Sequence, residues 1–209
     1  MELFFSCAVH GGSLVWLPEL GWGYANPDSA DFKYDKDYFQ HYVSVSNTAM
    51  GERLTAARLE IVKRHTDGEV VDIGIGAGLF VERRGACTFG FDINQASVNW
   101  LKERGLFIDP YKQVIDSATF WDSLEHIVDP RKLLDNIKRF AFVSMPIYDD
   151  VAHLLKSKHF KKGEHVYYFT FDGLIRWMKR YGFECIENNR VETDLGRKDI
   201  GSFVFRRTP

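Results

Sequence analysis

The feature that most constrains the fold is an alternation of strand-like and helix-like segments from residue 69 onward. Short apolar segments, rich in β-branched and aromatic residues, occur at 69–73, 87–92, 115–122, 140–145, 183–188 and 201–207. Segments with helical spacing of apolar residues lie between most of them, at 79–84, 95–105, 130–139 and 171–182. This alternation predicts an α/β fold, in which a mostly parallel sheet has helices on both faces.

The two ends of the chain depart from this alternation. The last two predicted strands have only a short connection, which predicts an antiparallel hairpin at one end of the sheet. Residues 1–48 are rich in Gly, Trp, Tyr and Pro, and we interpret them as an aromatic-rich extension or cap before a domain at 49–209. A hairpin is expected at 13–24, and helices at 34–47 and 48–65.

The aromatic side chains of the extension have three open interpretations. They cover the substrate as a lid, they cover the edge of the sheet, or they form a dimer contact. The residues concerned are Trp16, Trp22, Tyr24, Tyr38 and Tyr42. The sequence predicts no oligomeric state.

Composition narrows the class of protein. The chain has 209 residues, enough for one complete core, and a formal net charge of -2, without the basic excess typical of nucleic-acid-binding surfaces. No apolar run reaches the roughly 18 residues of a membrane span, so no membrane partner is expected. Three cysteines, odd in number and far apart, are typical of a reducing compartment, which predicts a cytoplasmic protein.

A glycine-rich turn follows the first predicted strand, in the segment VDIGIGAG (71–78). Gly74, Gly76 and Gly78 permit positive φ and allow backbone N–H groups to approach a ligand closely. The segment GFDIN (90–94) ends the next strand with Asp92, and an acid at this place can accept hydrogen bonds from a ribose diol. A glycine turn together with such an acid predicts a nucleoside-containing ligand.

The details of the turn favour one kind of nucleoside. The glycines form Gly-x-Gly-x-Gly rather than the Gly-x-Gly-x-x-Gly of nicotinamide dinucleotide sites. Asp72 precedes the first glycine by two residues, and its carboxylate would repel a pyrophosphate. The ammonium and sulfonium of S-adenosylmethionine would instead be attracted, so we expect that cofactor.

The ordered set of segments resembles the class I S-adenosylmethionine-dependent methyltransferases over about residues 50 to 207. VDIGIGAG looks like their first motif and GFDIN like their ribose-binding acid. FWDSLEHIVDP (120–130) and the segment GEHVYYFTFDGLIRWMKRYGFECIE (163–187) resemble the branch that includes the ubiquinone-type O-methyltransferases.

This resemblance implies a Rossmann-like, mostly parallel seven-stranded sheet and methyl transfer to an O or N atom, with a small-molecule acceptor favoured. The implied cofactor contacts are Asp72, Gly74, Gly76, Gly78, Asp92, Ile93, Trp121 and Asp122. In one respect the chain departs from the family, because LFIDPYKQV (106–114) is too short for a complete third strand and helix. The adenine contact is therefore uncertain between Asp109 and Asp116.

Three residues are candidates for catalysis: His126, Glu125 and His165. His126 has the pKa range of a general base, but the alternative that it fixes the strand-to-helix turn as scaffold is favoured. His165 falls in a region that lines the substrate pocket of the resembled family.

A divalent-metal site is a further possibility for the segment from Asp122 to His126. In some ubiquinone O-methyltransferases and small-RNA 2′-O-methyltransferases a Glu-x-x-Glu-His segment contributes to a metal site. Asp122-x-x-Glu125-His126 is similar, and its oxygen and imidazole groups suit Mg²⁺ or other divalent metals. The sequence offers no obvious fourth ligand, so no residue is assigned to a metal.

Two other functions remain open. The first is methylation of nucleic acid or a nucleotide, supported by a basic cluster that we otherwise interpret as solvated surface: Lys156, Lys158, Lys161 and Lys162. The second is a non-catalytic module that binds S-adenosylmethionine, which the shortened third-strand segment would favour.

Overall fold

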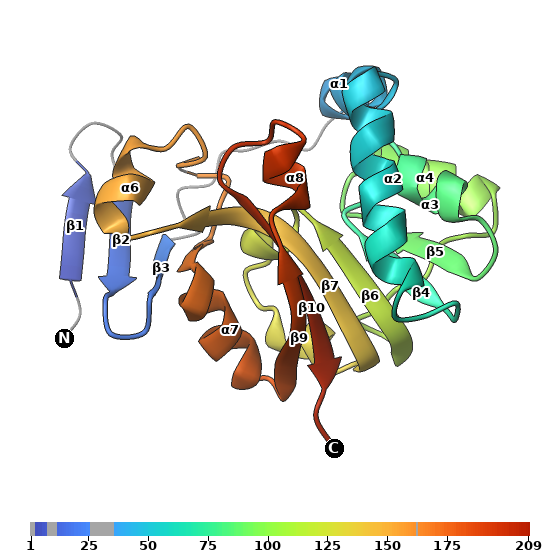
Figure 1. The fold of residues 1–209 in the computed structure, drawn as a ribbon. Helices are drawn as coiled ribbons and strands as arrows, with labels where there is room; N and C mark the ends of the chain where they lie inside the picture. The colour runs from blue at the N-terminus through green and yellow to red at the C-terminus, as the bar shows by residue number, and fades with distance from the viewer. Residues whose placement is uncertain (1–2, 8–11, 26–35, 162) are drawn as a thin grey trace.

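A computed structural model describes residues 3–7, 12–25, 36–161 and 163–209, and its centre is a twisted sheet (Figure 1). Four parallel strands stand in the order β5 (Thr88–Phe91), β4 (Val70–Ile73), β6 (Ile115–Trp121) and β7 (Ile137–Tyr148). Next to β7, β10 (Ile200–Arg207) runs antiparallel and pairs in turn with β9 (Phe183–Asn189). The mostly parallel sheet and the antiparallel terminal hairpin are confirmed.

The sheet is wider than the seven strands predicted, because β7 is long enough to have a second set of neighbours. Near its carboxyl end β7 pairs with β8 (Tyr167–Thr170), through Ile147 and Tyr148. The N-terminal strands then continue the sheet in the order β3 (Trp22–Ala25), β2 (Gly12–Leu17) and β1 (Leu3–Cys7). The hairpin expected at 13–24 is therefore present as β2 and β3.

The third-strand region is as short as the sequence predicts. Where the resembled fold has a full strand beside β5, the described chain has one isolated parallel bridge between Gly90 and Phe107. Two backbone hydrogen bonds join this region to β5: Gly90 N–H donates to the Leu106 carbonyl, and Ile108 N–H donates to the Gly90 carbonyl.

Helices cover both faces of the sheet, as predicted. On one face α5 (Arg131–Leu134) and α7 (Phe171–Lys179) pack on a core that includes Phe120, Val143 and Trp177. On the other face α2 (Ala49–Lys63) and α3 (Leu79–Arg84) pack on a second cluster, with α8 (Val191–Asp194) beside it. Side-chain caps stabilise four helix starts: Thr48 caps α2, Asn94 caps α4 (Gln95–Glu103), Asp150 caps α6 (Val151–Lys156) and Thr170 caps α7.

One predicted helix, at 130–139, is mostly wrong. The helix α5 ends at Leu134, and β7 already begins at Ile137. The reason is tertiary: Ile137 is 1% exposed and pairs with Ile115 of β6, so burial in the sheet outweighs local helical spacing.

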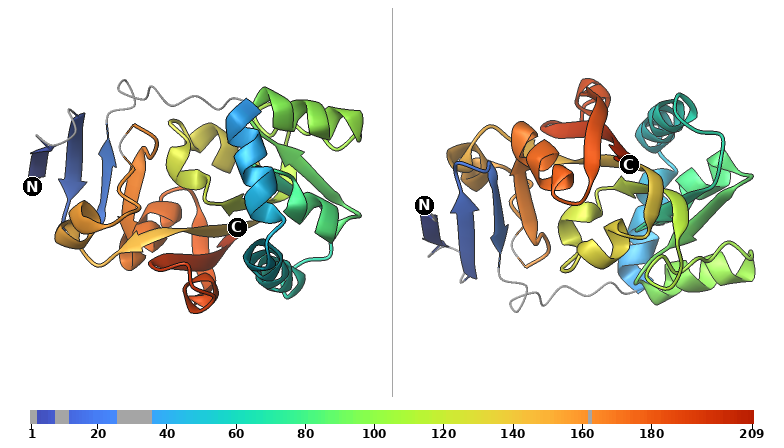
Figure 2. Two further views of the ribbon diagram at one scale, coloured as in Figure 1. Left: turned by 90° about the horizontal axis from the view of Figure 1, so that it is seen from above. Right: turned by 90° about the horizontal axis from the view of Figure 1, so that it is seen from below.

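Helix α1 (Lys36–Ser46) lies against α2 and α4, above the carboxyl ends of the parallel strands (Figures 1 and 2). Both helices expected at 34–65 are thus present. Among the described residues, no helix has the length and apolar character needed to cross a bilayer.

Candidate active site

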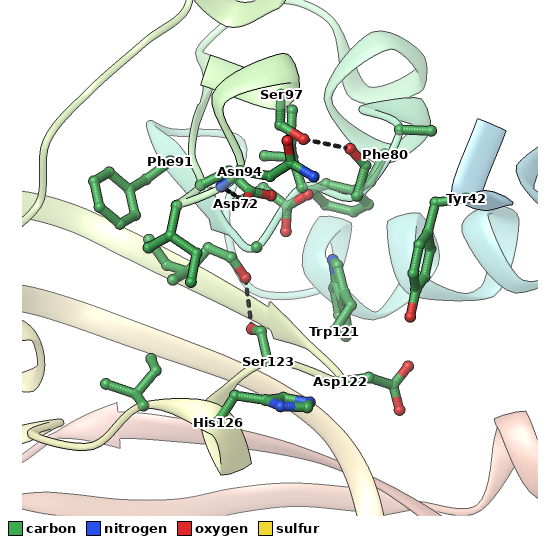
Figure 3. A pocket seen from close by; sticks show the side chains of 18 of the residues that line it. Tyr42, Asp72, Phe80, Phe91, Asn94, Ser97, Trp121, Asp122, Ser123 and His126 are labelled. Atoms are coloured by element: carbon green, nitrogen blue, oxygen red, sulfur yellow. Dashed lines mark hydrogen bonds between the residues drawn. The ribbon is translucent and has the colours of Figure 1, made fainter. Parts of the chain in front are cut away.

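A cavity of about 600 Å³ opens at the carboxyl ends of β4, β5 and β6, at the edge where the sequence predicts a nucleoside. This volume is typical of small-molecule sites. The strand ends, the glycine turn, the start of α4 and helix α1 all contribute to its walls (Figure 3). Most of the predicted cofactor residues line it: Asp72, Gly74, Gly76, Asp92, Ile93, Trp121 and Asp122.

The turn between β4 and α3 has a backbone shape that favours glycine. Gly74, Gly76 and Gly78 have φ angles of 79°, 53° and 82°. Gly78 does not line the cavity; a Cβ there would lie 2.8 Å from the ring of Trp100 on α4. A Cβ on Gly76 would lie 3.3 Å from the ring of Tyr42 on α1. Gly74 and Gly76 therefore shape the cavity, whereas Gly78 lets α4 pack against the turn.

Asp72 lies at the end of β4, directly before this turn, and is 2% exposed. The hydroxyl of Thr119 on β6 donates a hydrogen bond of 2.6 Å to its Oδ1. Burial raises the pKa of Asp72 to about 7, although the Thr119 hydrogen bond and the charge of Arg58 oppose the shift. A carboxyl group in this state gains more than an exposed one from a cation placed beside it.

Asp92 follows β5 and forms the adjoining wall. Its Oδ1 accepts the backbone N–H of Asn94 at 2.8 Å, and burial raises its pKa. Ile93, between them, lines the cavity and is 71% exposed. An acid and an exposed apolar side chain are thus presented side by side, next to the N-terminus of α4.

Trp121 and Asp122 end β6, and Asp122 belongs to an ion-pair network. Arg197 and Arg58 both donate hydrogen bonds to Asp122, and both also bind Glu192 of α8, whose side chain is 0% exposed. Burial opposes ionisation, but the charges of Arg197 and Arg58 lower the pKa of Asp122. Two arginines balance two acids, so Asp122 stays charged and is bound to protein partners. The Arg58 guanidinium also lies 5.1 Å from the Trp121 ring centroid.

The three candidate catalytic residues lie together across the cavity from the glycine turn. His126 lines the cavity, whereas Glu125 and His165 are buried behind it, at 1% and 5% exposure. The two imidazole rings meet edge to face, with centroids 4.6 Å apart. Burial lowers the pKa of both histidines, that of His165 to about 2. Both rings are therefore neutral near pH 7, in the form that a base or a metal ligand requires.

Two contacts hold this cluster together across a long stretch of sequence. The backbone N–H of Val166 donates to the carbonyl of Glu125 at 2.8 Å. Nδ1 of His126 lies 2.9 Å from the carbonyl oxygen of Glu164. The segment that enters β8 is thus attached to the 3-10 helix η2 (Leu124–His126), which brings His165 to the back of the cavity.

Several aromatic residues near this side of the site belong to the core. Tyr148 and Tyr168 are both 1% exposed and pack in one cluster with Trp16 of β2. Each tyrosine hydroxyl donates to a backbone carbonyl, those of His159 and Lys161. Of the aromatic residues in the extension, Tyr42 lines the cavity and Tyr24 is 38% exposed, while the side chain of Tyr38 lies outside the described residues.

Neither residue considered for the adenine contact lines the cavity. Asp116 lies near the start of β6 and pairs with Arg139, at the opposite end of the sheet. Asp109 pairs with Lys112 at 3.0 Å. From the shortened third-strand segment, Tyr111 reaches the cavity instead.

The sequence analysis missed Arg58 and Thr119, although each left a signal. Arg58 falls within the apolar stripe of α2, where a charge needs a buried partner. Thr119 is a hydroxyl in the buried part of β6, where it too needs a partner. In both cases the partner lies far along the chain, so the signal shows that a contact exists but not with which residue.

Comparison with known families agrees with this geometry. Residues 39–188 match the family model described as a methyltransferase domain. The match spans most of the chain, so the protein belongs to this family. The resemblance to class I methyltransferases and the predicted enzyme class are thereby confirmed, whereas the ubiquinone-type branch stays a prediction. A search of curated protein sequences finds no match.

Solved structures share the fold at low sequence identity. One is 1,6-didemethyltoxoflavin-N1-methyltransferase from Burkholderia thailandensis, with a TM-score of 0.59, 15% identity, and 98% of both chains covered. Magnesium protoporphyrin IX methyltransferase from Synechocystis gives a TM-score of 0.60 at 12% identity, covering 84% of this chain and 96% of its own. An S-adenosylmethionine-dependent methyltransferase from Thermotoga maritima gives 0.59 at 17% identity, covering 83% and 97%. These comparisons confirm the Rossmann-like fold.

Proposed function

We propose that the protein transfers a methyl group from S-adenosylmethionine to an oxygen or nitrogen atom of a small-molecule acceptor. The observation that carries this proposal is that the glycine turn and two acids face one cavity, with a neutral histidine on the opposite side. Family membership supports methyl transfer. The toxoflavin-type and protoporphyrin enzymes of the same fold were both solved with S-adenosylhomocysteine, the product of such a transfer.

The cofactor binds along the glycine turn in this proposal. Asp92 accepts hydrogen bonds from the ribose hydroxyls, and Ile93 packs on the face of the adenine. Gly74 and Gly76 let the ligand approach the backbone, because no Cβ stands in its way. Asp72 attracts the ammonium of the methionine part, directly or through water. Trp121 and Asp122 complete the wall beside the methyl group.

The acceptor enters between α1 and the His126 side of the cavity. Methyl transfer needs a nucleophile held in line with the sulfonium, so the acceptor atom must lie between the glycine turn and His126. A cavity of about 600 Å³ that also holds the cofactor leaves room for a small acceptor. We assign helix α1, the last part of the 1–48 extension, a covering role, since Phe39, Tyr42 and Ser46 line the cavity from it.

The placement of the basic cluster favours a small acceptor over nucleic acid. Lys161, from the basic cluster, pairs with Glu164 at 3.3 Å, and none of the described lysines of that cluster lines the cavity. The cytoplasmic location stays a prediction from the cysteine pattern, in which Cys87 and Cys185 are free thiols. The base role of His126 also stays a prediction.

Calorimetric titration with S-adenosylmethionine tests the cofactor assignment, with NAD as the matched control ligand. We expect binding of one S-adenosylmethionine per chain and none of NAD, because of the acid before the turn. Formation of S-adenosylhomocysteine in the presence of a small-molecule extract then tests catalysis. Absence of cofactor binding contradicts the proposal, and binding without turnover on any extract favours the non-catalytic alternative. Salt-dependent binding of nucleic acid would favour a nucleic-acid acceptor.

A further inference from the structure

One end of the cavity is apolar, and part of its surface is unburied. Its lining consists of Phe91, Ile93, Tyr111, Ile127 and Val128. Ile93 and Val128 are 71% and 57% exposed, more than any other large hydrophobic side chain among the described residues. Exposed apolar side chains in a concave site indicate a ligand with an apolar group, because its binding would remove them from water.

Contacts between the lining residues place them at the same end. The rings of Phe91 and Tyr111 meet edge to face, with centroids 5.5 Å apart. Together with Ile127, both rings pack on the main core cluster of the sheet. Ile93 lies two residues after Phe91, and Val128 directly follows Ile127. The two exposed side chains therefore extend an apolar surface that the core holds in place.

The proposed position of the ribose directs the purine to this end. Asp92, which accepts hydrogen bonds from the ribose in that proposal, lies between Phe91 and Ile93 in the chain. The base is attached to the same sugar, so it extends onto the side chains that flank Asp92. Phe91 lies at the far end of the cavity from Tyr42 of helix α1, beside which the acceptor enters (Figure 3). A flat purine fits this end better than the charged methionine part does.

Tyr111 is held in position by its own short loop. Its backbone N–H donates to Oδ1 of Asp109 at 3.0 Å, and the side chain of Asn136 donates to the Pro110 carbonyl at 2.8 Å. Oδ2 of Asp109 lies 3.0 Å from the ammonium of Lys112. Both oxygens of this acid thus have partners within the protein. The loop presents the ring of Tyr111 to the cavity in place of an acid.

Strong recognition of the 6-amino group of adenine requires an acceptor that is shielded from water. Asp129 and Lys132 also line the cavity, but both are exposed. Hydrogen bonds to exposed groups compete with water and contribute little. A site that holds a group by apolar packing discriminates weakly between molecules of the same shape, whereas a buried hydrogen bond discriminates by several orders of magnitude.

Building on the proposed function, we propose that Ile93, Tyr111 and Val128 hold the purine of the cofactor by apolar packing, and that the site discriminates little between adenine and hypoxanthine. Hypoxanthine has the shape of adenine, with a carbonyl oxygen in place of the 6-amino group. Both bases therefore pack equally well on the three side chains. Tyr111 and Val128 take the place of the acid that the shortened third-strand segment does not bring into the cavity.

Calorimetric titration with S-adenosylhomocysteine and with S-inosylhomocysteine, its deaminated analogue, tests the base preference. We expect the two dissociation constants to agree within about tenfold, because the packing is the same for both bases. A larger loss for the inosine compound overturns the proposal, since it reveals a hydrogen bond to the amino group. If the parent protein binds neither compound, the proposed function fails, and the purine assignment fails with it.

Substitutions test the packing residues. Tyr111→Ala should weaken both compounds at least about tenfold, in the range for loss of a ring that stacks on a base. Tyr111→Phe should keep the affinity within about twofold, because the ring remains. Val128→Ser should weaken both compounds by about fivefold. Val114→Ser is the matched control, because Val114 has a similar exposure of 54% but does not line the cavity, so the affinity should stay unchanged.

The loss in each variant should be the same for both compounds, since packing does not depend on the group at position 6 of the purine. Because Val128 is exposed, Val128→Ser leaves the core intact and decides the test if Tyr111→Ala fails to fold. Unchanged affinity in either folded variant overturns the proposal. Binding of S-adenosylhomocysteine by the parent protein would then leave the proposed function in place.

Discussion

The two sides of the cavity are built in different ways. The glycine-turn side comes from one continuous stretch, residues 72–97, and consists largely of backbone and the acids at two strand ends. The opposite side combines η2, the segment entering β8, and helix α1, and it consists of side chains held by contacts between distant segments. The comparison suggests two separable parts, one for the cofactor and one for the acceptor. A change in one part should leave the other intact.

The largest effect is expected from Gly76→Val. At φ 53° a β-branched side chain is strained, and its Cβ would enter the cavity beside Tyr42. We expect S-adenosylmethionine affinity, measured by calorimetry, to fall at least about 1,000-fold, or roughly 4 kcal/mol.

Gly85→Val is the control for that change. Gly85 also has positive φ, at 71°, but a Cβ there meets no atom within 4 Å. Gly85→Val therefore introduces the same kind of backbone strain, but its side chain does not enter the cavity. Equal loss of cofactor affinity in both variants would show that strain, not the cavity, is responsible, and would break the proposed division.

The opposite test is His126→Gln. This substitution removes the Nε2 lone pair while keeping a polar group of similar length. We expect the rate of S-adenosylhomocysteine formation to fall about 100-fold or more, in the range for loss of a positioned acid–base group. The dissociation constant for S-adenosylmethionine should stay within about twofold. A large change in cofactor affinity would mean that the two parts are coupled.

A smaller effect is expected from Asp92→Ala. Loss of a charged hydrogen bond to the ribose should weaken S-adenosylmethionine by about 1 to 3 kcal/mol. Asp92→Asn keeps the acceptor for the Asn94 N–H, so it separates loss of charge from collapse of the turn. An unchanged dissociation constant in both variants would remove Asp92 from the site.

The smallest effect concerns pH. Since the pKa of Asp72 is raised to about 7, the free protein holds a proton there below that pH, and binding a cationic ligand must release it. As pH increases towards 7, affinity for S-adenosylmethionine should therefore rise by up to about tenfold per pH unit. Above pH 7 it should level off. Stability of the free protein should change in the opposite sense, falling as pH rises from the ordinary pKa of the acid towards 7. Asp72→Asn should flatten both profiles.

The same division explains how much the sequence could predict. The cofactor side depends on short-range features, namely a strand, three glycines at fixed spacing and an acid after the next strand. The residues predicted there to contact the cofactor line the cavity, apart from Gly78, whose glycine is needed for packing against Trp100. Their contact with a cofactor stays a prediction. Local sequence carries this information because one turn determines the geometry.

The opposite side could be predicted only in part. His126, Glu125 and His165 were each chosen, but nothing local shows that Val166 binds the Glu125 carbonyl and so joins them. The pairing of β8 with β3 and the early start of β7 were missed for the same reason. Each depends on burial and pairing with residues far along the chain, which override local spacing.

The ion-pair network around Asp122 has a consequence for turnover. Arg58 and Arg197 are paired with Asp122 and Glu192, so the four charges balance and the acids beside the glycine turn leave this wall with a net negative potential. A sulfonium experiences that potential and a thioether does not. Once the methyl group has left, the spent nucleoside has lost a unit of charge and is held less firmly. The wall that attracts the cationic methyl donor therefore also favours release of the uncharged-sulfur product after transfer.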